Sequence, residues 1–294
     1  MTAIRGVRLL RVNLRCGDDE RADGVPTRLG KTAMSVHPEI HILDHDGVQW
    51  AAEAARLMLA LRQQAVTLRG RFWVALSGGR TPEQLYHQLV SISYAARNEW
   101  SSTHFFFSDE RCVPPDHPDS NYHLAEQALF RPLNIPGNRI HRMKGERPDP
   151  AAAAEEYEEL LRREMNAAPA DWPRFDLVLL GVGNDGHTAS LFPGTDALHE
   201  PRRWVTVGRA PVKPSTRLTL TLGVINEATV VLFLASGESK APILKTILEP
   251  MQEPDRQLPA ARVRPERGRL IWLLDRPAAA KLTGLYAKDP PRLI

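Results

Sequence analysis

Short apolar runs alternate with longer helical stretches along most of this chain of 294 residues. Six runs predict strands: Ile40–Leu43, Phe72–Ser77, Phe105–Ser108, Leu177–Gly181, Val230–Ala235 and Leu270–Leu274. The last four are apolar runs of the kind found in strands that are buried on both faces. Apolar residues or good helix formers recur at helical spacing in three intervening stretches, which are Val48–Leu68, Pro82–Ile92 and Ala151–Met165. This alternation is typical of βα units and predicts an α/β domain with a mostly parallel sheet.

The length allows one large α/β domain or two smaller ones, and the pattern favours one. The predicted catalytic domain covers residues 37–285. Residues 1–36 mix Arg, Gly, Asp and Thr with little periodicity, which predicts a poorly ordered extension. Met34, just before the first strand, is a candidate for the true start, and residues 286–294 are expected to form a tail.

Charge and cysteine content restrict the expected partners. The net charge of +3 comes from 38 basic and 35 acidic residues, and much of the excess lies in Arg-rich ends, so it does not indicate a nucleic-acid partner. Cys16 and Cys112 are far apart and are expected to be free thiols in a reducing cytosol. Apolar stretches such as Thr229–Ala235 are far shorter than the roughly 20 residues of a membrane span, and no secretory signal is recognised. We therefore expect a cytoplasmic protein with a small-molecule partner.

The turn after the second predicted strand has a composition suited to an anion: Ser77, Gly78, Gly79, Arg80, Thr81 and Pro82. Two glycines let the backbone approach a ligand closely, Thr81 can cap the next helix, and Pro82 suits the first helical position. Exposed amides at a helix start, with Arg80 beside them, favour a phosphate. The same residues also fit a plain strand-to-helix turn. The ending of a Walker loop is absent.

A charged loop, Asp109-Glu110-Arg111, follows the aromatic strand, and Ser120-Asn121 opens another helix. Open α/β sheets bind their ligands at the carboxyl ends of parallel strands, so this loop is a candidate wall of a site. A solvated charged turn with Ser120 as a helix cap is the alternative.

A glycine-rich segment follows the most apolar strand. Its Gly181, Gly183 and Gly186 match a dinucleotide-binding fingerprint, but Pro193 and Gly194 come too soon for the long helix that this fingerprint requires. A catalytic interpretation is also open, because Asp185 and His187 lie two residues apart in the same segment.

An imidazole can take a proton from water at neutral pH, and a carboxylate beside it can be its electrostatic partner. His187 can instead be a structural histidine. A metal-binding Asp-x-His is disfavoured because no further ligands stand at a recognisable spacing. Downstream, Arg217 and Lys240 can reach a phosphate held on the first turn, or can be surface charges.

Taken together, four segments resemble the 6-phosphogluconolactonase family in order and spacing: Leu76–Pro82, Asp109–Pro114 with Ser120-Asn121, Leu179–Gly194 and Thr216–Lys240. The run Gly-Asn-Asp-Gly-His-Thr-Ala-Ser-Leu-Phe-Pro-Gly is highly specific, and the resemblance covers roughly residues 38–283. It implies a three-layer α/β/α fold, similar to that of glucosamine-6-phosphate deaminase. It also implies hydrolysis of 6-phosphoglucono-δ-lactone to 6-phosphogluconate in the oxidative pentose phosphate pathway, without a metal or organic cofactor.

The resemblance assigns His187 as the base that activates water and Asp185 as its neighbour. Arg111 is expected near the lactone end as an oxyanion donor, with backbone amides around Gly183 as the alternative. Arg80 departs from the small hydroxyl residue that many relatives carry there. The expected substrate-binding residues are Ser77, Gly78, Gly79, Arg80, Thr81, Asp109, Asn121, Gly183, Arg217 and Lys240.

Two other functions are weighed against this one. The deaminases resemble the chain through Asp-Gly-His but follow it with a segment that contains a catalytic Glu, whereas Thr188–Pro193 has no carboxylate. A sugar-phosphate-sensing domain of a transcription regulator would carry an amino-terminal helix-turn-helix, and residues 1–36 are too short and too poorly patterned for one. We expect a monomer or weak homodimer with no nucleic-acid or membrane partner.

Overall fold

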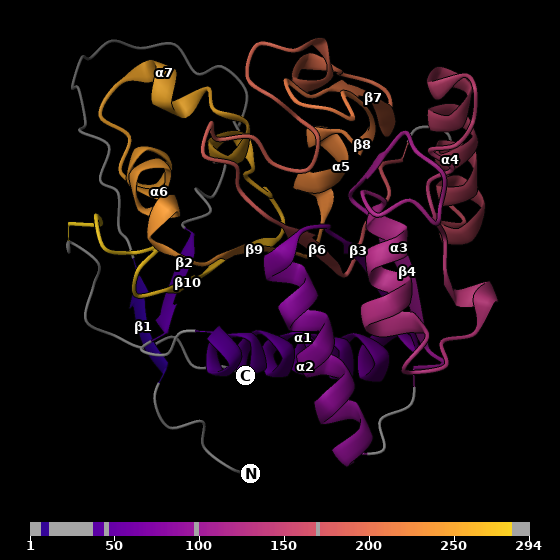
Figure 1. Cartoon of the computed structure of the whole chain (residues 1–294), viewed down its shortest axis with the longest axis horizontal. Helices are drawn as coiled ribbons and strands as arrows, with labels where there is room; N and C mark the ends of the chain where they lie inside the picture. Colours follow the sequence, from indigo (N-terminus) through magenta and orange to yellow (C-terminus); the bar gives the residue numbers. More distant parts are fainter. Residues whose placement is uncertain (1–6, 12–37, 44–46, 97–99, 169–170, 284–294) are drawn as a thin grey trace, which may run out of the picture.

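The computed structural model describes residues 7–11, 38–43, 47–96, 100–168 and 171–283 of the chain. Within these ranges the larger of two sheets has seven strands (Figure 1). Their order across the sheet is β1 (Val7–Arg11), β2 (Glu39–Leu43), β10 (Arg269–Asp275), β9 (Val230–Ala235), β6 (Leu177–Leu180), β3 (Phe72–Leu76) and β4 (Thr103–Phe107). The six strands from β2 to β4 are parallel, and β1 pairs antiparallel with β2. The predicted mostly parallel sheet is therefore confirmed.

Helices lie on both sides of this sheet (Figure 1). The side of α1 (Gly47–Arg69) and α2 (Arg80–Ala96) is opposite to that of α5 (Leu222–Glu227) and α6 (Ala241–Leu248). The other α-helices of the described residues are α3 (Asn121–Ala125), α4 (Pro150–Met165) and α7 (Glu253–Arg256). The resulting three layers agree with the predicted α/β/α architecture.

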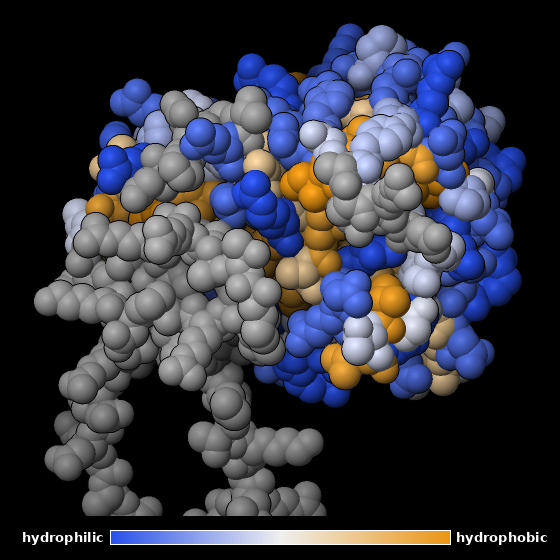
Figure 2. All heavy atoms as spheres, turned by 90° about the horizontal axis from the view of Figure 1, so that it is seen from below, coloured by the Kyte–Doolittle hydropathy of each residue, from blue (hydrophilic) through white to orange (hydrophobic). Residues whose placement is uncertain are grey.

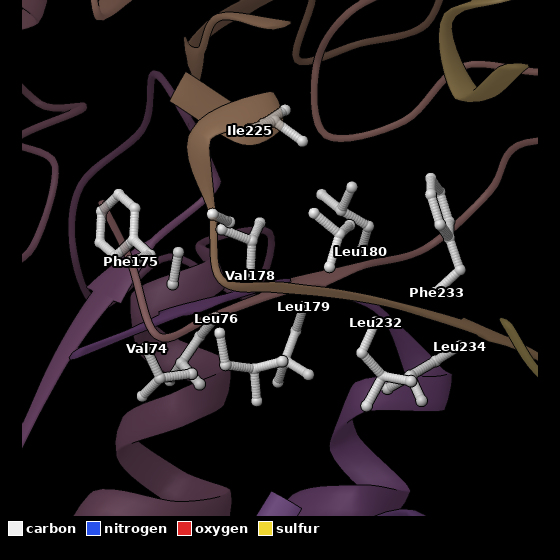
Figure 3. Close-up of a cluster of buried hydrophobic side chains, with 14 of the residues drawn as sticks. Val74, Leu76, Phe175, Val178, Leu179, Leu180, Ile225, Leu232, Phe233 and Leu234 are labelled. Carbon is white, nitrogen blue, oxygen red and sulfur yellow. The ribbon is translucent and has the colours of Figure 1, made fainter. Parts of the chain in front are cut away.

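The central strands are buried on both faces, as their apolar runs predict. Side chains alternate across the sheet, so Leu179 packs on the side opposite to Val178 and Leu180 (Figure 3). The β3, β6 and β9 strands are buried throughout. The rings of Phe233 and Trp272, from neighbouring strands, stack with centroids 3.8 Å apart. Burial of this apolar surface is the main stabilising contribution to the fold.

A second, three-stranded antiparallel sheet is absent from the sequence-based prediction. It consists of β5 (Asp109–Arg111), β8 (Thr216–Leu220) and β7 (Val205–Arg209), in that order. The chain reaches it directly from the larger sheet, because β5 begins two residues after β4 ends. It therefore extends from the carboxyl edge of the parallel strands, where the predicted site residues gather.

The amino-terminal expectation needs a correction for five residues. Val7–Arg11 form β1, which pairs with the edge strand β2 from Val7 opposite Leu43 to Arg11 opposite Glu39. An edge strand offers unpaired backbone groups that a neighbouring extended segment can satisfy. The rest of residues 1–36, including Cys16 and Met34, and the expected tail at 286–294 lie outside the described residues. Cys112 is a free, half-buried thiol, and burial raises its pKa to about 11.

The surface on the side of α1 and α2 is mainly hydrophilic where it is described, with apolar side chains in scattered patches (Figure 2). Leu68 of α1 and Tyr94 of α2 are among the exposed large side chains. Single exposed apolar residues of this kind are usual on soluble domains. None of the described helices is both long and apolar enough to cross a membrane.

Asp149 provides a test of local helix stability. Its carboxylate caps α4 by accepting a hydrogen bond from the backbone N–H of Ala151 at 2.9 Å. Replacing Asp149 with alanine is expected to lower the free energy of unfolding by about 0.5–2 kcal/mol. Asp149→Ser should stay close to wild type, because serine caps helices as well as aspartate does. Urea unfolding measures both variants, and equal losses would contradict a capping role.

Candidate active site

A cavity of about 620 Å³ opens where the parallel strands end. Its walls come from the segments that follow β3, β4, β6 and β9 and from the second sheet. Every site residue that the sequence predicts lines this cavity: Ser77, Gly78, Gly79, Arg80, Thr81, Asp109, Arg111, Asn121, Gly183, Asp185, His187, Arg217 and Lys240. The structure thus brings together residues that are spread over more than half of the chain.

The turn between β3 and α2 differs in one respect from the expectation. The helix begins at Arg80, and the backbone N–H of Glu83 bonds to the carbonyl of Gly79 at 3.1 Å. Thr81 therefore lies inside the first turn rather than at the predicted cap. Gly79, just before the helix, adopts a φ of +101°, a backbone conformation that glycine allows. The N–H groups of a first helical turn have no partners within the helix, so they are available to an anion in the cavity.

Gly78 is required by close packing. A Cβ atom at this position would lie 1.8 Å from Oδ1 of Asn121, which is itself buried and has no hydrogen-bond partner for that oxygen. The amide nitrogen of Asn121 donates to the backbone carbonyl of Asp109 at 2.8 Å. Asn121 therefore stands between the Gly78 turn and the Asp109 loop.

Asp109 is a buried carboxylate in the cavity wall, 6% exposed. Its Oδ2 accepts the hydroxyl of Ser190 at 2.6 Å, and its Oδ1 is 3.3 Å from the amide nitrogen of Asn121. Ser190 in turn belongs to the loop that carries His187. This network connects two walls of the cavity and provides a polar surface suited to the hydroxyl groups of a sugar.

Glu110 belongs to the charged loop, but the sequence-based prediction gives it no role of its own. In the structure it fixes the backbone of this loop. It is 2% exposed, and its carboxylate accepts the backbone N–H groups of Arg111 at 2.7 Å and Asn121 at 2.7 Å. Tyr122 N–H and the Ser120 hydroxyl bond to it as well. Burial raises the pKa of Glu110, and the backbone donors act in the opposite direction. Ser120 also caps α3. Both interpretations of the charged loop therefore hold, because it lines the cavity and leads into a capped helix.

Two arginines occupy opposite positions on neighbouring strands of the second sheet. Arg111 of β5 and Arg217 of β8 are directly paired across the antiparallel ladder. Arg217 is 7% exposed, and burial together with the neighbouring Arg111 lowers its pKa. Its Nε donates to the carbonyl of Pro214 at 2.6 Å. Like charges directly opposite each other destabilise a sheet, and an anion between them would relieve this cost.

Lys240 adds a third cation from the turn after β9. Its Nζ donates to Oδ1 of Asn184 at 2.9 Å. Burial lowers the pKa of Lys240, the nearby Asp185 raises it, and Arg80 lowers it further. Lys240 thus lies between the Arg80 turn and the loop that carries Asp185 and His187.

Asp185 and His187 form a close pair. Nδ1 of His187 is 2.5 Å from Oδ1 of Asp185, which also accepts the His187 backbone N–H at 3.1 Å. Burial acts to raise the pKa of Asp185, but these two hydrogen bonds from His187 outweigh it, so the pKa lies below its usual value. A carboxylate that accepts the Nδ1 proton leaves Nε2 with its lone pair. The ring of Phe192 stacks on the imidazole with centroids 4.3 Å apart.

The backbone around this pair bears on the choice of oxyanion donor. The Gly183 N–H donates to the carbonyl of His187 at 2.9 Å, and the Gly186 N–H donates to the carbonyl of Gly183 at 3.0 Å. Both amides are therefore engaged within the loop. Arg111, by contrast, lines the cavity and has a buried Nε without a partner, although its Nη1 donates to the carbonyl of Asp119 at 2.5 Å. The arrangement favours Arg111 over the Gly183 amide.

The dinucleotide interpretation of the glycine-rich segment is excluded by the local fold. After β6 the chain makes turns and an isolated bridge between Thr188 and Leu191, and its next helical element is a single 3₁₀ turn, Asp196–His199. A dinucleotide site requires a long helix here to receive the pyrophosphate.

Part of the cavity wall is apolar and was not predicted from the sequence. Phe192, Pro211 and Val212 line the cavity, and Val212 is 63% exposed. Phe192 lies five residues after His187, inside the specific motif, and could have been predicted from that position. Pro211 and Val212 belong to an irregular connection between β7 and β8, for which no sequence pattern gives a position.

One cluster of metal-ligand side chains lies elsewhere in the described residues. His104, His141 and Glu164 bring one ligand atom each within 4.8 Å of one another, and none of them lines the cavity. Nδ1 of His104 is 3.0 Å from Nε2 of His141, and Arg139 contacts the other nitrogen of His104. Burial lowers the pKa of His141 to about 4. The cluster is thus a hydrogen-bonded pair of histidines beside a cation.

Known proteins of one family resemble this chain over most of its length. The model of the family "Glucosamine-6-phosphate isomerases/6-phosphogluconolactonase" matches residues 45–272. The 6-phosphogluconolactonase of Nostoc sp. is 40% identical over 232 residues, which are 79% of this chain and 93% of that protein. The human 6-phosphogluconolactonase is 40% identical over 240 residues, which are 80% of this chain and 91% of that protein.

Solved structures give the same result. The 6-phosphogluconolactonase from Trypanosoma cruzi superposes with a TM-score of 0.75 at 31% identity, over 85% of this chain and 98% of that one. A monomeric glucosamine-6-phosphate deaminase shares the fold, with a TM-score of 0.67 at 22% identity over 82% of this chain and 99% of that one. The chain therefore belongs to the family of glucosamine-6-phosphate isomerases and 6-phosphogluconolactonases.

Proposed function

We propose that this chain hydrolyses 6-phosphoglucono-δ-lactone to 6-phosphogluconate, the ring-opening reaction of the oxidative pentose phosphate pathway, with His187 as the general base. The observation that carries the proposal is the pair of His187 and Asp185, whose Nδ1 and Oδ1 atoms are 2.5 Å apart. The other walls of the same cavity carry Arg111, Arg217 and Lys240. A substrate with a phosphate at one end and an ester at the other matches a cavity that holds cations and a base.

In the proposed reaction, Nε2 of His187 takes a proton from water as the water oxygen attacks the lactone carbonyl carbon. Asp185 stabilises the imidazolium that forms, and Arg111 stabilises the negative charge on the carbonyl oxygen. The tetrahedral intermediate then collapses, the bond to the ring oxygen breaks, and the imidazolium returns its proton to that oxygen. A positioned base contributes about a hundred- to ten-thousandfold, and one oxyanion donor about a hundred- to a thousandfold.

The phosphate is assigned to the part of the cavity between the turn after β3 and the cations Arg217 and Lys240. The turn of Ser77, Gly78 and Gly79 offers backbone N–H groups at the start of α2, and Thr81 adds a hydroxyl. Arg217 and Lys240 supply charge from the other side, and Arg80 is a further cation where many relatives carry a hydroxyl. Asp109 and Asn121 would contact the sugar hydroxyl groups between the two ends.

The decisive assay is hydrolysis of freshly generated 6-phosphoglucono-δ-lactone, followed through 6-phosphogluconate dehydrogenase with EDTA present and the spontaneous rate subtracted. Rapid turnover that depends on the protein and survives EDTA would support the proposal, including its independence of a metal. A rate equal to the blank would contradict it. Release of ammonia from glucosamine 6-phosphate would instead favour a deaminase, and tight sugar-phosphate binding without turnover would favour a sensor.

Lys240→Ala is expected to raise KM by about ten- to a hundredfold while kcat stays near the wild-type value, because a hydrogen bond to a charged group contributes about 1.5–3 kcal/mol. Initial rates over a range of lactone concentrations measure both constants. Lys281→Ala removes an exposed lysine that does not line the cavity and is the matched control. An unchanged KM in Lys240→Ala would move the phosphate away from this residue.

We also propose that the protein acts in the cytosol, without nucleic acid, as a monomer or weak homodimer. The modest net charge of +3 supports a small-molecule partner rather than a nucleic acid. Light scattering at two protein concentrations tests the state of assembly.

A further inference from the structure

Asp275 is a buried residue that does not line the cavity. Its carboxylate holds the turn that precedes Lys240 in the chain. It is 2% exposed and is the last residue of β10. Its Oδ2 accepts the hydroxyl of Ser236 at 2.6 Å, and both of its oxygens lie 3.0 Å from the backbone N–H of Gly237. Oδ1 also accepts the N–H of Ala278 at 2.8 Å. Both carboxylate oxygens of Asp275 thus accept hydrogen bonds from backbone N–H groups.

The sheet explains why this carboxylate reaches that turn. Leu274 of β10 is paired with Ala235, the last residue of β9, so the next residues along the two strands, Asp275 and Ser236, come side by side. Gly237 has a φ of +93° and its N–H points to Asp275. The Gly237 carbonyl in turn accepts the N–H of Lys240 at 3.0 Å. An unbroken series of short contacts therefore runs from Asp275 to the backbone of Lys240.

We infer that Asp275 is a positioning residue that acts through Lys240, and that it sets the affinity of this site for a phosphate group. The inference rests on the proposed function, in which Lys240 contacts the substrate phosphate. Asp275 does not line the cavity, so it cannot contact the substrate. Lys240 has a long flexible side chain, and the entropy lost on ordering it is smaller when its backbone is already fixed.

The expected result of Asp275→Asn is a rise in KM for the phosphorylated lactone of about tenfold, because the exchange weakens charge-assisted hydrogen bonds to the turn. The kcat value should stay near wild type, since the pair of His187 and Asp185 lies on another loop. Inorganic phosphate, as a competitive inhibitor, should lose affinity by the same factor. Ser236→Ala removes only the 2.6 Å contact and should give a smaller change in the same direction.

A double-mutant cycle tests the inference. If Asp275 acts through Lys240, then Asp275→Asn combined with Lys240→Ala should raise KM no further than Lys240→Ala alone. Asp255→Asn is the matched control, because Asp255 accepts the backbone N–H groups of Met251 and Gln252 at a turn that does not line the cavity.

Three outcomes would overturn the inference. The first is an unchanged KM and phosphate affinity in Asp275→Asn. The second is a double variant whose rise in KM equals the product of the rises in the two single variants, and the third is an equal rise in KM in Asp255→Asn. If Asp275→Asn does not fold, Ser236→Ala carries the same test, and an unchanged KM there is equally decisive. Failure of the proposed function is seen separately, as an unchanged KM in Lys240→Ala or as no turnover in the wild-type protein.

Discussion

His187→Ala is expected to lower kcat by about a hundred- to ten-thousandfold, because the variant lacks the imidazole that takes the proton from the attacking water. The imidazole is held by a 2.5 Å contact to Asp185 and by the ring of Phe192, so its loss removes a pre-positioned proton acceptor. The phosphate turn and Lys240 are on other segments, so KM is expected to change little. Steady-state rates with the spontaneous hydrolysis subtracted measure this loss.

His199→Ala is the control for this variant, because His199 is exposed and does not line the cavity. Its kcat should equal that of the wild type. Residual activity of His187→Ala above the spontaneous rate is expected from Arg111 and from substrate binding alone. Wild-type kcat in His187→Ala would remove His187 from the mechanism.

The central sheet was predictable from the sequence because its strands are buried on both faces. Val230–Ala235 is predicted and observed with the same limits, and it is apolar at every position. The neighbouring strands differ by one or two residues at their ends, where Ser77, Ser108 and Gly181 leave the sheet to enter the cavity loops. The errors are confined to the strand ends, and they occur at amino ends such as Thr103 and Arg269 as well as at the ends that enter the cavity loops.

The second sheet was not predictable in the same way. Asp109–Arg111 is only three residues long and carries three charges, so nothing in its composition indicates a strand. It pairs with Thr216–Leu220, which is more than a hundred residues away in the sequence. Strands this short are stabilised by long-range pairing and by contacts such as those of Glu110, neither of which appears in a local pattern.

The site was easier to predict than its supports. Residues that follow parallel strands meet at one edge of the sheet, and a specific motif adds chemical identity, so His187, Asp185 and Lys240 could all be named. Asp275 holds the turn before Lys240, and Glu110 holds Arg111 and Asn121, each through hydrogen bonds to the backbone. Their partners are determined by strand order and register, which the sequence alone does not provide.

The second large effect is expected from Gly183→Ala. A Cβ atom at position 183 would lie 2.0 Å from Nδ1 of His187 and 2.5 Å from Oδ1 of Asp185. Real carbon atoms do not approach that closely, so the pair must move or separate. Displacement of a catalytic group by about 1 Å can cost on the order of a hundredfold in rate, and we expect a loss in kcat of at least about that size with KM near wild type.

Gly181→Ala is a closely matched comparison, because it makes the same chemical change two residues earlier in the same cavity loop. A Cβ atom there would meet no atom within 4 Å, so kcat should remain near wild type. A normal kcat in Gly183→Ala would contradict the prediction: either the loop shifts without separating the pair, or the close contact between Asp185 and His187 is not required for catalysis. Equal losses in both variants would point instead to the loop backbone as a whole. A loss confined to Gly183→Ala would attribute the rate to the position of the pair, because this variant retains both functional side chains and lacks only the space that keeps them together.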